Sequence, residues 1–200
     1  DAGGGVYVTR GGGFNLSGGQ IKENEASSGD GGGVLIDNGV FYMTGGSINN
    51  NDAESGNGGG IALRYAYFAA ISGGGITYNS ANGVGGGIYV SSGSQLTISG
   101  GVSIESNKAF LKEDQDERPS GQGGGIYVGD GGKVTMTDGR IWSNYAKSSG
   151  GGVYMAGGEL TLNNVGLEYN KGYIGNPASP IDGSAVYMAG GVLTMNGGTI

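Results

Sequence analysis

The sequence lacks cysteine and histidine and contains only 3 proline residues among 200. The absence of cysteine excludes a disulfide framework and thiolate chemistry, and the absence of histidine removes the commonest metal ligand and general base. Basic residues are scarce, since 10 lysine and arginine residues against 17 aspartate and glutamate residues give a net charge of -7. Nucleic-acid-binding surfaces are basic, and a membrane span needs about 20 apolar residues. We therefore expect no cofactor, no nucleic-acid partner and no direct membrane insertion of this segment.

Glycine, in contrast, is abundant and supplies 50 of the 200 residues. The scarcity of proline and the absence of a three-residue period exclude a collagen helix. A disordered glycine-rich linker should lack apolar residues, whereas 36% of this chain is hydrophobic and those residues fall at fixed places. Glycine adopts positive φ angles without steric cost. The composition therefore favours a repeat fold with many tight corners.

The first repeated segment is a glycine triplet followed by an apolar-x-apolar sequence. Its starts are separated by 28, 27, 27, 38, 27 and 33 residues, so a repeat of about 27 residues recurs and two repeats carry insertions. The insertions fall near residues 110–121 and 173–182. The triplets begin at Gly3, Gly31, Gly58, Gly85, Gly123 and Gly150, and a degenerate seventh copy begins at Gly183.

Two further segments recur within each repeat. The second is apolar-x-apolar-x-Gly-Gly, as in Phe14 to Gly19, and the sixth repeat departs from it with Asn163-Asn164. The third is apolar-x-x-Asn-x-small, in which an isoleucine or leucine always precedes the asparagine by three residues. Asparagine can bond nearby backbone, accept left-handed turns and stack into amide ladders, so we expect a structural ladder. Its members are Asn24, Asn51, Asn79, Asn107, Asn144 and Asn170.

Alternation of apolar and other residues in all three segments is typical of strands with one buried face. The sequence therefore predicts an all-β fold, a right-handed single-stranded parallel β-helix over residues 1–200, as one domain that is a piece of a longer protein. We expect about seven coils of about 27 residues, with three short strands per coil. A coil cannot bury its own apolar side chains, and stacking makes the core continuous. In coil one the predicted core is Val6, Val8, Phe14, Leu16 and Ile21.

The pairing of Gly-Gly-Gly-Val/Ile with Ile-x-x-Asn resembles the short repeats of polymorphic outer-membrane proteins. It also resembles glycine-rich β-helix repeats in large surface proteins of bacteria. The resemblance covers nearly the whole chain, although isoleucine or Leu167 stands where the first family has phenylalanine. It implies an extracellular, adhesin-like module and carries over no catalytic residue.

The residue between the two core positions of the first strand should point outward. In four consecutive coils this residue is tyrosine, and exposed aromatic rows suit stacking on sugar rings or contacts with proteins. The same rings can instead stack on one another and stabilise strand pairing. The column consists of Tyr7, Leu35, Ala62, Tyr89, Tyr127, Tyr154 and Tyr187, of which the last four are candidate ligand-binding residues.

The two insertions should project beside this tyrosine column, because both directly precede the first strand of a coil. Long loops on a rigid scaffold often carry function, although both could be tolerated, solvated loops. The acidic residues of the first could also bind Ca²⁺, but their spacing matches neither the EF-hand nor the calcium nonapeptide. The candidate binding residues here are Glu113, Asp114, Asp116, Glu117 and Tyr173.

Two other functions have weaker support in the sequence. A carbohydrate-active β-helix lyase or hydrolase would need convergent charged groups, such as two carboxylates at a defined separation. The outward acidic residues Asp37, Asp130, Asp138 and Glu159 fall in different columns. An outward threonine column suggests ice binding, but strand propensity explains it more simply. It consists of Thr97, Thr135, Thr161 and Thr194.

The sequence thus predicts a non-enzymatic structural and adhesive module of a bacterial cell-surface or secreted protein. It would present a tyrosine-rich face and two loops to a glycan or to a surface protein of a host or another cell. The alternatives are the carbohydrate-active enzyme and a pure stalk or spacer. Open strand edges at the two ends also favour end-to-end self-association.

Overall fold

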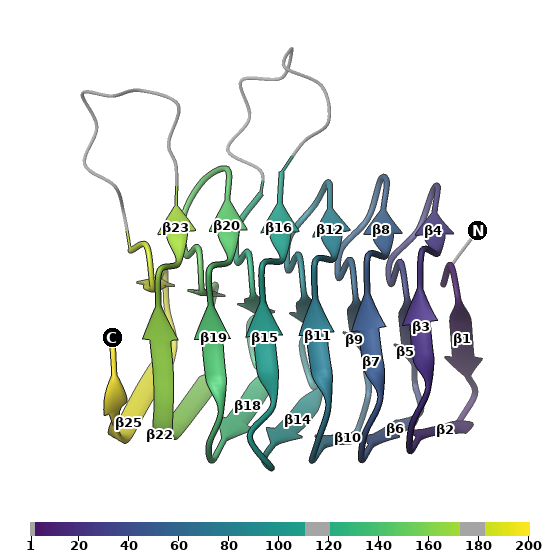
Figure 1. Cartoon of the computed structure of the whole chain (residues 1–200), viewed down its shortest axis with the longest axis horizontal. Coiled ribbons are helices and arrows are strands. Elements are labelled where there is room, and N and C mark those ends of the chain that lie inside the picture. The colour runs from purple at the N-terminus through teal and green to yellow at the C-terminus, as the bar shows by residue number, and fades with distance from the viewer. Residues whose placement is uncertain (1–2, 111–120, 173–182) are drawn as a thin grey trace.

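A computed structural model describes residues 3–110, 121–172 and 183–200. All regular structure in these residues is β-strand, and every strand pair is parallel. Strands that pair with each other lie about 27 residues apart in the sequence, so the chain forms a three-sheet parallel β-solenoid of about seven coils. In Figure 1 the near strands run upward, those behind run downward and the chain advances from right to left, so the winding is right-handed.

The first sheet contains the strand that follows each glycine triplet. In spatial order it consists of β1 (Val6–Thr9), β5 (Val34–Asp37), β9 (Ile61–Arg64), β13 (Ile88–Val90), β17 (Ile126–Val128), β21 (Val153–Met155) and β24 (Val186–Met188).

The second sheet contains two rows of strands. One row consists of β2 (Gly13–Leu16), β6 (Val40–Met43), β10 (Phe68–Ile71), β14 (Gln95–Ile98), β18 (Lys133–Met136), β22 (Glu159–Glu168) and β25 (Val192–Thr199). The other consists of β3 (Gln20–Lys22), β7 (Ser47–Asn49), β11 (Gly75–Thr77), β15 (Ser103–Glu105) and β19 (Arg140–Trp142), and β22 extends into it and joins the rows.

The third sheet contains six strands of two residues each. They are β4 (Glu25–Ala26), β8 (Asp52–Ala53), β12 (Ser80–Ala81), β16 (Lys108–Ala109), β20 (Tyr145–Ala146) and β23 (Lys171–Gly172). The three repeated segments of the sequence are all present, and the third divides into two strands around the asparagine. The residue directly before each asparagine, and not the asparagine itself, has the left-handed conformation, as Ser106 (φ 55°) and Ser143 (φ 52°) show.

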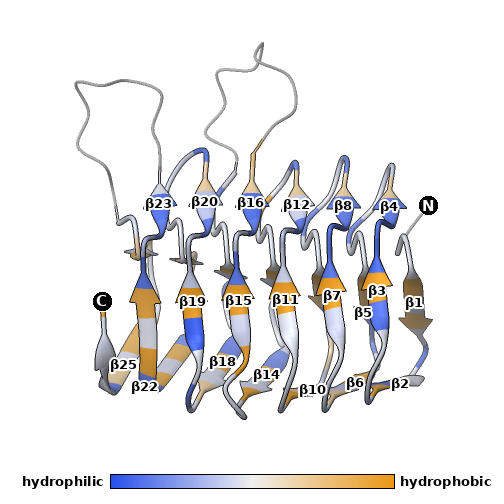
Figure 2. Cartoon of the chain, in the orientation of Figure 1, coloured by the Kyte–Doolittle hydropathy of each residue, from blue (hydrophilic) through white to orange (hydrophobic). Residues whose placement is uncertain are grey.

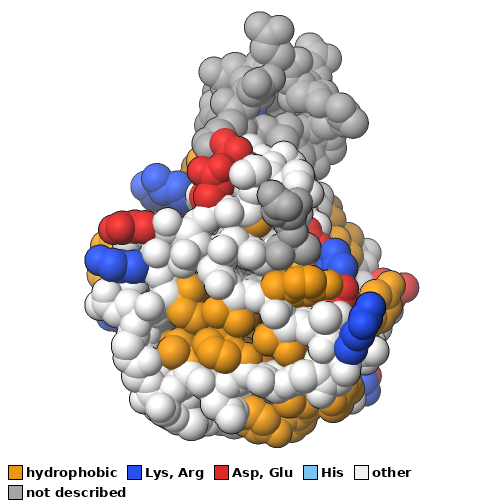
Figure 3. Space-filling model, turned by 90° about the vertical axis from the view of Figure 1, so that its right-hand side faces the viewer, with side chains coloured by type: hydrophobic (Ala, Val, Ile, Leu, Met, Phe, Trp, Pro, Cys, Tyr) orange, Lys and Arg blue, Asp and Glu red, His pale blue; other side chains and the backbone are white. Residues whose placement is uncertain are grey.

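The core runs through the stack as columns of one residue per coil. The apolar positions predicted from the alternation point inward, and in coil five all of them are at most 1% exposed. Figure 2 shows the apolar bands at equivalent places on successive strands. In coil one, Val6, Val8, Phe14 and Ile21 are only partly buried. Figure 3 looks onto that end of the stack, where apolar side chains are open to view.

The six asparagines form one continuous ladder between coils. From Asn51 to Asn170, each Oδ1 accepts hydrogen bonds of 2.9–3.1 Å from the backbone N–H and the Nδ2 group of the asparagine one coil earlier. From Asn51 onward, each Nδ2 group also donates to a backbone carbonyl of the preceding coil, as Asn107 does to Ile76 at 2.9 Å. Because these amides are buried, their paired state avoids the cost of unsatisfied polar groups.

The glycine triplet has a separate physical reason at each position. Gly123 has a φ of +67°, which disfavours a side chain. A Cβ on Gly124 would lie 2.4 Å from the carbonyl oxygen of Tyr145, and a Cβ on Gly125 would lie 3.1 Å from Nδ2 of Asn144. The third glycine therefore packs against the ladder asparagine and also against the carbonyl oxygen of Gly152, which would lie 2.6 Å from its Cβ, whereas a neighbouring carbonyl and a positive φ angle constrain the other two.

Candidate functional site

The four consecutive tyrosines form a stack of rings along the outside of the first sheet. The centroids of Tyr127 and Tyr154 are 5.3 Å apart with an interplanar angle of 3°, and those of Tyr154 and Tyr187 are 5.1 Å apart at 16°. Tyr89 and Tyr127 are 5.7 Å apart and tilted by 30°. The strand register places these residues directly opposite one another. The faces of these rings therefore pack against one another.

The exposure of this stack is limited. Tyr154 is 8% exposed, and Tyr89, Tyr127 and Tyr187 are half-buried. Burial raises the pKa of Tyr89, Tyr127 and Tyr154 above the ordinary value, and the neighbouring phenol Tyr154 raises that of Tyr127 further. The hydroxyl groups thus remain protonated and able to donate hydrogen bonds well above neutral pH.

The upstream part of the same column differs from the sequence-based expectation. Leu35 and Ala62 point away from the core but are 0% exposed, so they present no outward surface. Tyr7 is 48% exposed and is separated from the other tyrosines by these two residues. The stack of tyrosines therefore begins at Tyr89.

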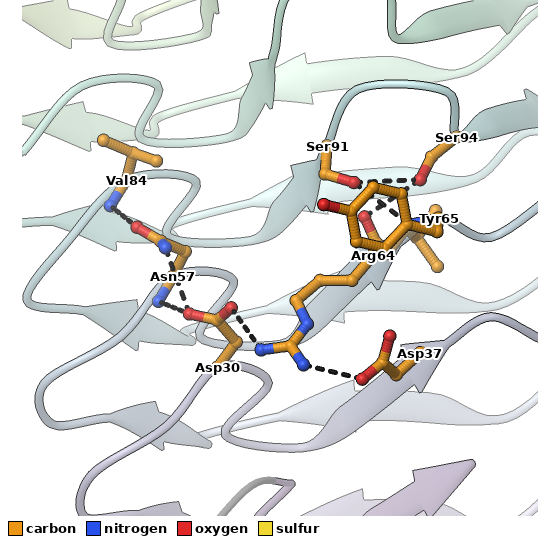
Figure 4. A network of polar contacts seen from close by, with 9 residues as sticks. Asp30, Asp37, Asn57, Arg64, Tyr65, Val84, Ser91 and Ser94 are labelled. Carbon is orange, nitrogen blue, oxygen red and sulfur yellow. Dashed lines mark hydrogen bonds and ion pairs between the residues drawn. The ribbon is translucent and has the colours of Figure 1, made fainter. Parts of the chain in front are cut away.

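A polar network lies along the first sheet in coils two to four (Figure 4). Arg64 bridges two aspartates, with Nη2 at 2.6 Å from Asp37 and Nη1 at 3.5 Å from Asp30. The hydrogen bond to Asp37 is the main cause of a raised pKa of Arg64. Asn57 donates its N–H and its Nδ2 to Asp30, at 2.8 and 3.0 Å, and accepts from the N–H of Val84. The network ties three consecutive coils together and gives Asp37 a structural partner.

The corner after Arg64 also departs from the glycine-rich corners of other coils. Tyr65 has a φ of 49°, a conformation that is strained for a bulky side chain. The backbone N–H groups of Tyr65 and Ala66 donate to the hydroxyls of Ser91 and Ser94, at 3.1 and 3.0 Å. Hydrogen bonds from the next coil therefore hold this corner in place.

The candidate residues of the insertions, Glu113, Asp114, Asp116, Glu117 and Tyr173, lie outside the described residues. So does the calcium site considered for the first insertion. Within residues 3–110, 121–172 and 183–200, no group of three or more acidic side chains lies close enough together to hold a metal ion. In the same residues no helix is long and apolar enough to cross a membrane.

The other outward acidic residues and the threonines have their own surroundings. Glu159 pairs with Lys133 at 3.1 Å, and Asp138 accepts a hydrogen bond from the N–H of Gly101. Strand pairing aligns the four threonines of the second sheet in one column, as Thr135 with Thr161 illustrates.

A hollow that the sequence interpretation missed lies on the second sheet, on β19 and β22. It has a volume of about 180 Å³ and is lined by Arg140, Trp142, Gly166 and Glu168. Trp142 is the only tryptophan of the chain and takes an outward position beside the core residue Ile141. The sequence repeat alone could have indicated this site, because its register places Glu105 and Glu168 on either side of Trp142.

No family model, no curated protein sequence and no solved structure compared with the chain matches it. The fold is established by the geometry itself, which is that of a three-sheet parallel β-solenoid.

Proposed function

We propose that this chain is a non-enzymatic structural and adhesive module of a bacterial cell-surface or secreted protein, and that its tyrosine face contacts a glycan or protein partner. One observation carries the proposal: the inward columns repeat from coil to coil, whereas the outward columns change along the stack. The ladder from Asn24 to Asn170 continues through six coils, while the tyrosine stack occupies the coils from Tyr89 onward. A rigid interior that repeats in every coil, with outward side chains that differ between coils, is suited to holding one binding surface in place.

The tyrosine face offers the half-buried rings of Tyr89, Tyr127 and Tyr187 at intervals of one or two coils, with the nearly buried Tyr154 between the last two. The rings are held by stacking, so little side-chain entropy remains to be lost on binding. Tyrosine is enriched at interfaces because it combines an apolar ring with a polar tip. The insertions near residues 110–121 and 173–182 precede β17 and β24 in the sequence, and on this sequence position alone we include them in the proposal.

The extracellular location rests on the resemblance of the paired glycine and asparagine segments to repeats of polymorphic outer-membrane proteins and other bacterial surface proteins. The net charge of -7 also favours partners other than nucleic acid.

The test is binding of the purified chain to arrays of glycans and of surface proteins. A triple variant, Tyr127→Phe, Tyr154→Phe and Tyr187→Phe, keeps the ring stack and removes three hydroxyls. Tyr78→Phe serves as a control because Tyr78 is 60% exposed in the turn between β11 and β12, away from the first sheet. We expect the triple variant to lose at least tenfold in affinity and the control to bind as the natural chain does. A ligand that binds all three proteins equally, or no ligand at all, would reject the face and favour the spacer.

A further inference from the structure

The hollow around Trp142 is lined by outward residues of β19 and β22, and β15 pairs with β19 on the far side from β22. β15, β19 and β22 pair in register, so that Glu105, Trp142 and Glu168 form one column and Ser103, Arg140 and Gly166 form the next. These strands belong to the second sheet, whereas the tyrosine stack lies on the first. The hollow is therefore a surface separate from the proposed tyrosine face.

Arg140 is held in place by three contacts. Its Nε donates to Oγ of Ser103 at 2.9 Å, its Nη2 donates to Oε2 of Glu105 at 2.7 Å, and its guanidinium carbon lies 4.8 Å from the centroid of the Trp142 ring. These bonds involve Nε and Nη2, and within the described part of the chain Nη1 has no bonded partner. A guanidinium fixed by stacking and pairing is already oriented to donate to a ligand.

Gly166 leaves the space that forms the hollow. It is the direct strand partner of Arg140. A Cβ there would make ordinary contacts of 3.6 Å with Thr199 and 3.7 Å with Glu168. Unlike the triplet glycines, Gly166 is therefore not required by packing, and the equivalent position in coil one carries Gln20. A longer side chain at Gly166 should fill the hollow without disturbing the core.

Glu168 supplies an acceptor that lines the hollow, and Tyr169 packs against Trp142 beside it. The ring of Tyr169 is 70% exposed and lies edge-on to Trp142, with centroids 5.6 Å apart at 73°. Oε1 of Glu168 accepts a hydrogen bond of 3.1 Å from Thr199, which orients the carboxylate at the rim. Arg140, Trp142 and Glu168, which carry a donor, an aromatic ring and an acceptor, thus line one small space.

This combination matches the chemistry of a sugar ring. The C–H groups of a pyranose pack against an aromatic ring, while adjacent hydroxyls accept from a guanidinium and donate to a carboxylate. A volume of about 180 Å³ is below the roughly 300–1,000 Å³ of sites for drug-sized ligands, so it suits one sugar unit. Glu105 neutralises Arg140 at 2.7 Å, so the carboxylate of Glu168 in the lining should repel anions. We propose that the hollow binds one neutral pyranose with adjacent hydroxyl groups.

The single tryptophan makes the site directly observable. Because Trp142 is the only indole in the chain, its intrinsic fluorescence reports on this hollow alone. Titration with neutral sugars that differ in the arrangement of their hydroxyls should give a saturable change with at least one of them, at an affinity on the order of 1 mM for so small a ligand. Galacturonic acid and inorganic phosphate, the anionic probes, should give none.

Three variants locate the site. Gly166→Gln should fill the hollow and Glu168→Gln should remove the charged acceptor, and both should weaken binding at least tenfold. Glu159→Gln, on the same strand but in the exposed ion pair with Lys133, is the matched control and should titrate as the natural chain does. Circular dichroism of each variant checks that the β-solenoid forms.

The proposal is overturned if no neutral sugar produces a saturable change, if only the anions do, or if Gly166→Gln folds and titrates normally. The outcome is independent of the proposed function, because the triple tyrosine-to-phenylalanine variant should leave the fluorescence titration unchanged. Loss of array binding in that variant, with an inert hollow, would support the tyrosine face and reject the sugar site.

Discussion

The asparagine column and the tyrosine column both place one residue per coil, yet they connect the coils in different ways. Asn107 accepts two hydrogen bonds from Asn79 and donates to Asn144 and to the carbonyl of Ile76, entirely out of contact with water. Tyr127 touches its neighbours through ring faces and remains half-buried. Removal of one amide from a buried ladder leaves the groups of its neighbour unpaired, whereas a stack of rings can stop at any coil without such a cost. This difference explains why the first column is uniform and the second is not.

The largest effect should come from breaking the ladder. Asn107→Ala leaves the N–H and Nδ2 groups of Asn79 without their acceptor in a buried site, which should cost about 3–5 kcal/mol of unfolding free energy. Asn196→Ala is the control, because the Asn196–Asn163 bond of 2.9 Å is exposed, and it should cost less than about 0.5 kcal/mol. Urea denaturation followed by circular dichroism compares the two. Equal losses would contradict a structural role for the buried column.

Overpacking of the glycine triplet should have the next largest effect. In Gly124→Ala the new methyl group would lie 2.4 Å from the carbonyl oxygen of Tyr145, so the coils must separate at a cost of about 2–3 kcal/mol. Gly166→Ala, whose methyl group finds only contacts of 3.6 Å or more, should be nearly neutral. Thermal melting of both variants measures the difference in stability. A Gly124→Ala variant as stable as the natural chain would show that packing does not require the triplet.

Truncation of the tyrosine stack should be milder. Tyr127→Ala removes two ring contacts, each worth about 0.5–1.5 kcal/mol, and should cost about 1–2 kcal/mol in the same urea assay. Tyr127→Phe keeps the rings and should stay within about 0.5 kcal/mol of the natural chain. If the alanine variant were as stable as the phenylalanine variant, the stack would contribute nothing to the fold.

The smallest effect should appear at alkaline pH. Burial raises the folded-state pKa of Tyr89, Tyr127 and Tyr154, so the folded chain holds these protons more tightly than the unfolded chain. Their contribution to stability is fully present below the unfolded pKa of about 10 and is lost as pH rises through the raised folded values. The midpoint of urea unfolding should therefore decrease between pH 9 and 12, and the decrease should be smaller in Tyr127→Phe.

The interior could be predicted from the sequence because its constraints are periodic. The alternation at Ile126 and Val128 and the regular spacing of the asparagines follow from strand geometry and stacking alone. The burial of Leu35 and Ala62 could not be predicted, because their surroundings come from neighbouring coils. The left-handed conformation of the residue before each asparagine could not be predicted, because glutamate, serine and tyrosine stand at that position as well as asparagine. Trp142 was overlooked because its partners Glu105 and Glu168 lie one coil away on either side.

Hydrogen exchange at the ladder amides tests the central claim most directly, that buried asparagines bind the coils into one cooperative stack. The backbone N–H groups of Asn51, Asn79 and Asn107 each donate to the Oδ1 of the next asparagine. Measured by NMR on the native chain, these amides should exchange together and at the slow rate set by unfolding of the stack. In Asn107→Ala the Asn79 amide should lose most of its protection. Exchange of the three amides at the rate of an unstructured peptide, or unchanged protection of Asn79 in the variant, would contradict the ladder.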